Sequence, residues 1–124
     1  MNSTETSKTA LGINAEQHRI RIHASTLKAL GNPSHVQLLV NPESRIIAIR
    51  AVDKIQKGDQ TYRLPKTDRD TVITSKAFML RLQDAFPDLI KGRSCRLSGI
   101  AVSSEQIALF SVDTMTVLNT WDET

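Results

Sequence analysis

Two arginines at alternate positions are the first residues of this sequence that could do chemistry. Arg19 and Arg21 flank a single apolar residue, so in a β-strand both side chains would project from one face. Two guanidinium groups about one strand repeat apart could hold two phosphates of a nucleic-acid backbone. Residues 19–52 contain five basic residues and only one acidic residue, Glu43. The basic residues form a candidate nucleic-acid-binding set: Arg19, Arg21, Lys28, Arg45 and Arg50.

These arginines have a second interpretation, because both signs of charge decorate most soluble domains. Sixteen Lys and Arg against thirteen Asp and Glu leave a net charge of only +3, which permits an acidic partner without requiring one. The second half of the chain, 71–124, has slightly more acidic than basic residues. A functional positive surface is therefore expected in the first half.

Sequence patterns for catalysis, cofactors and metals are not recognisable. The glycines are too dispersed for a phosphate-binding loop, and no G-x-S-x-G elbow marks a nucleophilic serine. The histidines are not spaced with cysteines or carboxylates as zinc ligands are: His18, His23 and His35. We therefore expect no enzymatic activity, no cofactor and no metal site, although residues distant in the sequence could still meet.

Cys95 is the only cysteine, so no disulfide can form within the chain, and a reducing cytoplasm fits best. The neighbouring Arg96 could activate the thiol, but without a positioned histidine a small, buried strand residue is the favoured interpretation. The segment Met1–Ala15 lacks the basic start and continuous apolar stretch of an export signal. No apolar run approaches the roughly 20 residues that cross a bilayer, so we expect a soluble protein without membrane contact.

The first half of the chain predicts a strand, a short helix and a hairpin. Residues 1–17 are polar without periodicity, which predicts a flexible N-terminal arm. From Arg19 apolar and polar residues alternate as in a strand, and Leu27 and Leu30 are spaced as in a helix that stops at Gly31. Aliphatic runs over 36–40 and 45–52, on either side of a turn, predict the hairpin.

The second half of the chain repeats this order of elements. After a charged connection over 53–70, the sequence predicts a strand at 71–73, a helix over 75–86 and a hairpin from 96–102 and 106–112. We therefore infer a single domain over 18–124 built from two repeats, 19–52 and 71–112, the second about ten residues longer between helix and hairpin. The residues that would correspond are Ile22 with Ile73, Leu27 with Phe78 and Ile46 with Ile107.

Both hairpins contain a strand that is apolar on both faces, so neither strand can be a freely solvated edge. The sequence therefore predicts an α+β fold in which two strand-helix-hairpin repeats pack on one another as a pseudo-two-fold small barrel. Dimerisation would meet the same need. The side chains expected in the core are Ile22, Leu27, Leu38, Ile47, Phe78, Leu82, Ile107 and Leu109.

Three segments of the first repeat carry a resemblance to a known family: Arg19-Ile20-Arg21-Ile22, Leu27-Lys28-Ala29-Leu30-Gly31 and the hairpin from Val36 to Ile49. Together they resemble the AbrB and SpoVT type of swapped-hairpin domain, a small bacterial DNA-binding fold. The resemblance implies a swapped-hairpin-like barrel and DNA as a partner. With Gly31-Asn32-Pro33 and Val40-Asn41-Pro42-Glu43, the chain also resembles short proteins of Gram-positive bacteria that have no established activity.

Two functional hypotheses follow from the sequence. The first is a small nucleic-acid-binding regulatory protein that uses the basic first repeat. The alternative is a non-enzymatic protein-interaction or assembly module, acting as a homodimer or with another protein. Its surface would be formed by the two-sided apolar hairpins and Trp121, the only tryptophan.

Overall fold

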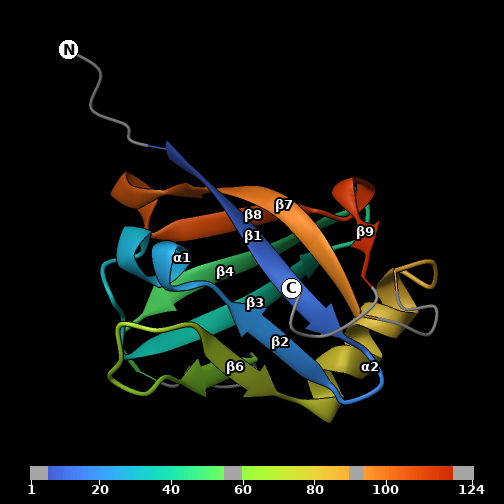
Figure 1. The fold of residues 1–124 in the computed structure, drawn as a ribbon, viewed down its shortest axis with the longest axis horizontal. Helices are drawn as coiled ribbons and strands as arrows, with labels where there is room; N and C mark the ends of the chain where they lie inside the picture. Colours follow the sequence, from blue (N-terminus) through green and yellow to red (C-terminus); the bar gives the residue numbers. More distant parts are fainter. Residues whose placement is uncertain (1–5, 55–59, 90–93, 119–124) are drawn as a thin grey trace.

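The computed structural model describes residues 6–54, 60–89 and 94–118. They form a mostly-β protein, a nearly closed eight-strand antiparallel barrel with two helices, α1 (Ala24–Ala29) and α2 (Lys76–Ala85), shown in Figure 1. The strands are β1 (Thr6–Asn14), β2 (Arg19–Ile22), β3 (His35–Asn41), β4 (Ile46–Val52), β5 (Thr61–Arg63), β6 (Thr71–Thr74), β7 (Ser94–Val102), β8 (Ile107–Ser111) and β9 (Thr116–Val117).

The barrel strands are ordered β5-β3-β4-β8-β7-β1-β2-β6, and the short β9 pairs with β7. The two ends of this path, β5 and β6, lie on either side of a seam. A hydrogen bond of 2.7 Å between the hydroxyls of Tyr62 and Ser75 crosses the seam. Pro65, just beyond β5, has no N–H to donate, so backbone pairing cannot continue there. One region of the barrel wall is therefore left open.

Successive residues of each strand point alternately into and out of the barrel, and the inward-pointing aliphatic side chains form the core. The largest fully buried side chains include all three phenylalanines: Phe78, Phe86 and Phe110. Six of the eight side chains expected in the core are buried: Ile22, Leu27, Leu38, Ile47, Phe78 and Leu82. The expectation for β8 is wrong by one residue. Ala108 and Phe110 point inward, and Ile107 and Leu109 are only half-buried, because successive residues of a strand face opposite sides.

The predicted flexible arm over 1–17 is wrong for the residues that the structure describes. Thr6–Asn14 forms β1, which pairs along its length with β7 and also with β2. Leu11 and Ile13 are fully buried. The domain therefore begins at least as early as residue 6, and not at 18. The backbone N–H and C=O groups of β1 are hydrogen-bonded to β7 and β2. This pairing depends on distant segments, so the polar composition of the N-terminal residues did not indicate a strand.

The predicted order of elements is confirmed in both halves. The first half runs β2, α1, β3, β4, and the second runs β6, α2, β7, β8. The connection over 53–70, predicted as a plain linker, contains β5, which pairs with β3. Trp121 lies outside the described residues. Neither described helix is long and apolar enough to cross a membrane.

Candidate functional site

A groove follows the α1–β3 turn, first between this turn and the chain that joins β5 to β6 and then between the turn and the end of β4. It consists of three neighbouring cavities of about 530, 520 and 510 Å³. The central cavity shares Pro33 and Ser34 with the second and Leu27, Asn32 and Thr67 with the third. We call this feature the basic groove, because its cationic lining residues outnumber the acidic pair Asp53 and Asp68: Lys28, Arg50, Arg63, Lys66 and Arg69.

The first wall of the basic groove is a sharp reversal of the chain after α1. Gly31 has φ 82° and Asn32 has φ 49°, two left-handed conformations in succession. The Asn32 N–H donates to the carbonyl of Leu27 over 2.8 Å, and the Gln106 side chain donates to the carbonyl of Leu30 over 3.3 Å. A Cβ on Gly31 would lie 3.1 Å from that Gln106 amide, and the left-handed backbone favours glycine at this position.

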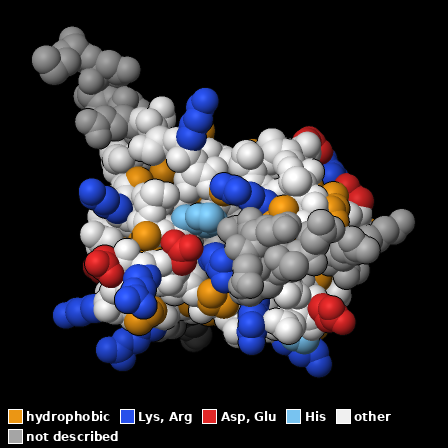
Figure 2. Space-filling model, in the orientation of Figure 1, with side chains coloured by type: hydrophobic (Ala, Val, Ile, Leu, Met, Phe, Trp, Pro, Cys, Tyr) orange, Lys and Arg blue, Asp and Glu red, His pale blue; other side chains and the backbone are white. Residues whose placement is uncertain are grey.

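The second wall of the basic groove is the segment 63–69. Leu64 is buried, and its N–H donates to the carbonyl of Ser34 over 2.8 Å, which ties this wall to the first. The Ala24 N–H donates to the Asp70 carboxylate over 2.8 Å and joins the walls again. The cationic residues Arg63, Lys66 and Arg69 are exposed on this segment. Figure 2 shows Lys and Arg side chains gathered at the left and lower left of the molecule, over α1 and this segment.

The structure brings together only part of the predicted binding set. Lys28 lines one end of the basic groove and Arg50 the other. The Arg50 guanidinium also hydrogen-bonds to the Gln37 side chain. Arg19 and Arg21 share the outer face of β2, as expected, but do not line the basic groove.

Sequence reasoning missed the three cations on the second wall of the basic groove, of which Arg63 and Lys66 line the central cavity and Arg69 the third. Arg63, Lys66 and Arg69 belong to the connection 53–70, whose acidic residues nearly balance its basic ones. The signal available was their spacing, one cation every third residue in an apolar-poor stretch. The spacing alone does not show that these cations share a surface. They do so because the hydrogen bond of Leu64 to Ser34 holds the segment next to the α1–β3 turn.

Arg45 occupies the far end of the hairpin, where its charge is already paired. Its guanidinium donates to Asp88 over 2.8 Å and to Asp113 over 2.7 Å, and it lies 5.7 Å from the centre of the Phe86 ring. Hydrogen bonds to Asp113 and Asp88 raise its pKa. Arg45 therefore joins the hairpin turn to the regions that follow α2 and β8, and we leave it out of the binding set.

His23 lies between α1 and β2, with one buried nitrogen. Its Nε2 makes no hydrogen bond within the described part of the chain. Burial lowers the pKa of His23 below 6.5; Asp70 opposes this shift, and Arg96 and Arg21 add to it. Among the described residues no group of three His, Cys, Asp or Glu is arranged to hold a metal ion. His23 therefore has the environment of a neutral imidazole.

We expect acid to destabilise the fold partly through His23. The unfolded chain takes up this proton near pH 6.5 and the folded chain only at lower pH, so stability falls as the pH drops through that window. His23→Gln should show a shallower loss of unfolding free energy between about pH 7.5 and 5.5. Urea unfolding at several pH values measures this, and identical pH profiles for parent and variant would contradict it.

Cys95 is a buried strand residue, as favoured from the sequence. Its thiol contacts the carbonyl of Leu89 at 3.8 Å, and burial raises its pKa to about 11. Arg96 is exposed on the opposite face of β7, so it does not activate the thiol.

We expect Cys95 to resist alkylation in the folded protein. At about pH 8 iodoacetamide should react roughly a hundredfold more slowly with the native chain than with the urea-unfolded chain, because so little thiolate is present. Mass spectrometry of timed samples measures both rates. Equal rates would show that the thiol is accessible and ionised in the native state.

Comparison with protein-family models, with curated proteins and with solved structures finds no match for this chain.

Proposed function

We propose that this protein is a non-enzymatic nucleic-acid-binding protein whose basic groove holds the sugar–phosphate backbone. The observation that carries the proposal is the groove itself, in which five cationic residues from three separate segments line adjoining cavities with two acidic ones. Phosphate contacts supply most of the affinity of non-specific nucleic-acid binding. Arg19 and Arg21, on the outer face of β2, are proposed as additional backbone contacts.

The described aromatic side chains favour backbone contacts over stacking. Phe78, Phe86 and Phe110 are buried, and the half-buried Tyr62 is engaged with Ser75 across the seam. Single-stranded nucleic acids commonly stack on exposed aromatic side chains, and none stands exposed in the part of the chain that the structure describes. We therefore expect affinity that depends strongly on salt and weakly on sequence.

The test is a fluorescence titration of the full chain with duplex DNA and with single-stranded DNA and RNA, each at two ionic strengths. The proposal expects binding at low salt that weakens steeply as salt is added, because counterions are released from the phosphates. Absence of binding below about 100 μM at low salt, weaker than ordinary non-specific association, would overturn it.

The proposal includes an internal duplication with a pseudo-two-fold, swapped-hairpin-like arrangement. Corresponding strands pair with each other, β2 with β6 and β4 with β8. The N–H of Ala51 donates to the Gln106 carbonyl, and the N–H of Val112 donates to the Arg45 carbonyl, each over 2.9 Å. Arg45 and Gln106, each just before its strand, both have left-handed φ values, 57° and 52°.

These reciprocal bonds support a two-fold axis between β4 and β8. The correspondence extends to β1 and β5, which precede β2 and β6 and pair with β7 and β3. The likeness to the AbrB and SpoVT domain would then lie in the whole pair of repeats. Internal superposition of the halves on an experimental structure tests the duplication, and unrelated strand paths would end it.

A row of apolar side chains on the outside of the barrel favours assembly as a second candidate function. Leu39, Ala48, Leu109 and Ile100 lie directly opposite one another across β3, β4, β8 and β7. Ile100 is 43% exposed. Apolar residues in one cross-strand row suit contact with a second copy of the chain. Sedimentation over a range of concentrations tests this, and a monomer throughout would reject self-association.

A further inference from the structure

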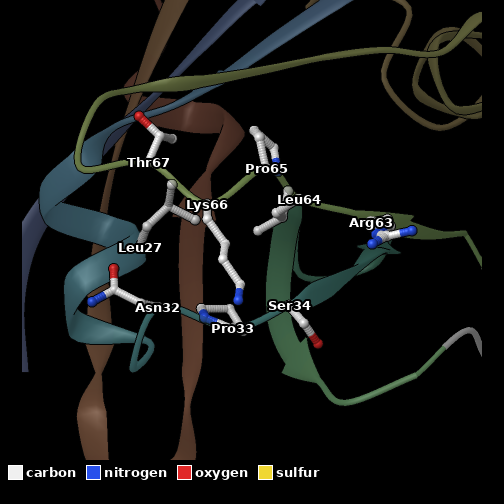
Figure 3. A pocket seen from close by; sticks show the side chains of 9 residues that line it. All are labelled: Leu27, Asn32, Pro33, Ser34, Arg63, Leu64, Pro65, Lys66 and Thr67. Atoms are coloured by element: carbon white, nitrogen blue, oxygen red, sulfur yellow. The ribbon is translucent and has the colours of Figure 1, made fainter.

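The central cavity of the basic groove has a lining that phosphate binding does not require. Its walls are largely aliphatic, formed by Leu27, Pro33, Leu64 and Pro65. Its volume of about 530 Å³ lies in the range of small-molecule sites. Figure 3 shows Lys66 extending from the second wall toward Pro33 on the first, while Arg63 points outward. The result is an apolar recess with a single cation across its opening.

The barrel architecture does not by itself require this cavity, because the equivalent position in the second half of the chain is occupied by a buried side chain, that of Leu89. The pairing of Leu64 with Ser34 beside the cavity corresponds to the pairing of Ile13 with Cys95. There Leu89 is buried and its carbonyl contacts the Cys95 thiol. Ser34, in contrast, is exposed. Leu89, after α2, therefore covers this place in the second half, and the short α1–β3 turn leaves it open in the first.

Asn32 adds a hydrogen-bonding group to this recess. Its side-chain amide makes no hydrogen bond within the described residues, although it lines both the central and the third cavity. An amide carries a donor and an acceptor side by side, as the edge of a nucleobase does. The left-handed backbone at Gly31 and Asn32, where the chain leaves α1, holds this amide at the rim.

We propose that the central cavity takes one unstacked nucleobase of a single-stranded nucleic acid. The aliphatic walls contact the faces of the base, Asn32 contacts its edge, and Lys66, Lys28 and Arg69 hold the adjoining phosphates. This proposal rests on the proposed function and narrows it to single strands. A duplex keeps its bases paired and stacked, and extruding one costs a few kcal/mol, so a duplex gains nothing from the cavity.

The test compares three fluorescent probes of equal length with the full chain: a single-stranded DNA, the same sugar–phosphate strand without bases, and a duplex. The single strand should bind roughly tenfold more tightly than the abasic strand, because contact of one base with the aliphatic walls removes apolar surface from water. The duplex, compared per strand at the same salt, should show no such advantage over the abasic strand.

The variant Asn32→Gly makes the test specific to the cavity. Glycine accepts the left-handed backbone, so the fold should remain, which circular dichroism verifies. We expect several-fold weaker binding of the base-containing strand and unchanged binding of the abasic strand. Lys66→Ala should weaken both strands, because it removes a phosphate contact.

The outcomes separate the two proposals. Equal affinity for the base-containing and abasic strands, with steep salt dependence, would overturn the base-binding cavity and leave the basic groove as a backbone site. Tighter binding of the duplex than of the single strand would overturn it in the same way. Failure of all three probes to bind at low salt would overturn the proposed function together with this inference.

Discussion

Replacing Lys66 and Arg69 together by alanine lowers the affinity for single-stranded nucleic acid at low salt by roughly tenfold or more and flattens the slope of its salt dependence by about 1.4. Each lost phosphate contact on a single strand removes about 0.7 from the slope of the logarithm of affinity against the logarithm of salt concentration. Both residues are exposed on the second wall of the basic groove, so the fold should be unaffected. Anisotropy titrations at four or more salt concentrations give the affinity and the slope.

The matched control is the double variant Lys76→Ala and Arg81→Ala. It removes the same two residue types, and both are exposed on α2, outside the basic groove. The net charge of the two double variants is therefore the same, and only the position of the lost charges differs. A similar loss of affinity in both would show that overall charge, and not the groove, attracts nucleic acid.

Replacing Gly99 by alanine destabilises the protein by about 3 kcal/mol or more, enough to unfold most of it if its stability is ordinary. Gly99 lies opposite Phe110 in the β7–β8 ladder. A Cβ there would lie 2.0 Å from the carbonyl oxygen of Leu109 and 2.6 Å from the Phe110 ring. The nearest atom is backbone, so the added methyl group can be accommodated only by separating two paired strands.

Thermal and urea unfolding followed by circular dichroism measure this loss. Ser98→Ala, at the exposed neighbouring position, is the control and should change stability by no more than about 0.5 kcal/mol. If Gly99→Ala melted within about 3 °C of the parent, β7 and β8 could not approach as closely as they do in this fold.

Much of the fold could be predicted from periodicity, because each strand or helix reveals its buried face through its own residues. Ile20 and Ile22 alternate with arginines, and both are buried in β2. The order of strand, helix and hairpin was predictable in both halves for the same reason. The internal correspondence of Ile46 with Ile107 is consistent with the reciprocal hydrogen bonds between β4 and β8.

The candidate site was predictable only in part, because charge acts between segments that are remote in the sequence. Arg45 and Arg50 were both predicted to bind nucleic acid, yet Arg45 forms ion pairs with Asp88 and Asp113 in the folded chain. Lys66 lies in a stretch of nearly balanced charge, yet in the fold it lines the cavity next to the one that Lys28 of α1 lines. Counting charges along the sequence shows neither the ion pairs of Arg45 nor the position of Lys66.

The sequence by itself determined which side chains are apolar enough to form a core, where the strands of each hairpin lie, and that the lone Cys95 has no internal disulfide partner. Only the tertiary structure decided that Thr6–Asn14 is a strand of the barrel and that the wall opens after β5. A side chain's periodicity is a property of its own segment. Pairing of backbone groups, neutralisation of charges and the space left between walls depend on partners that only the folded chain brings together.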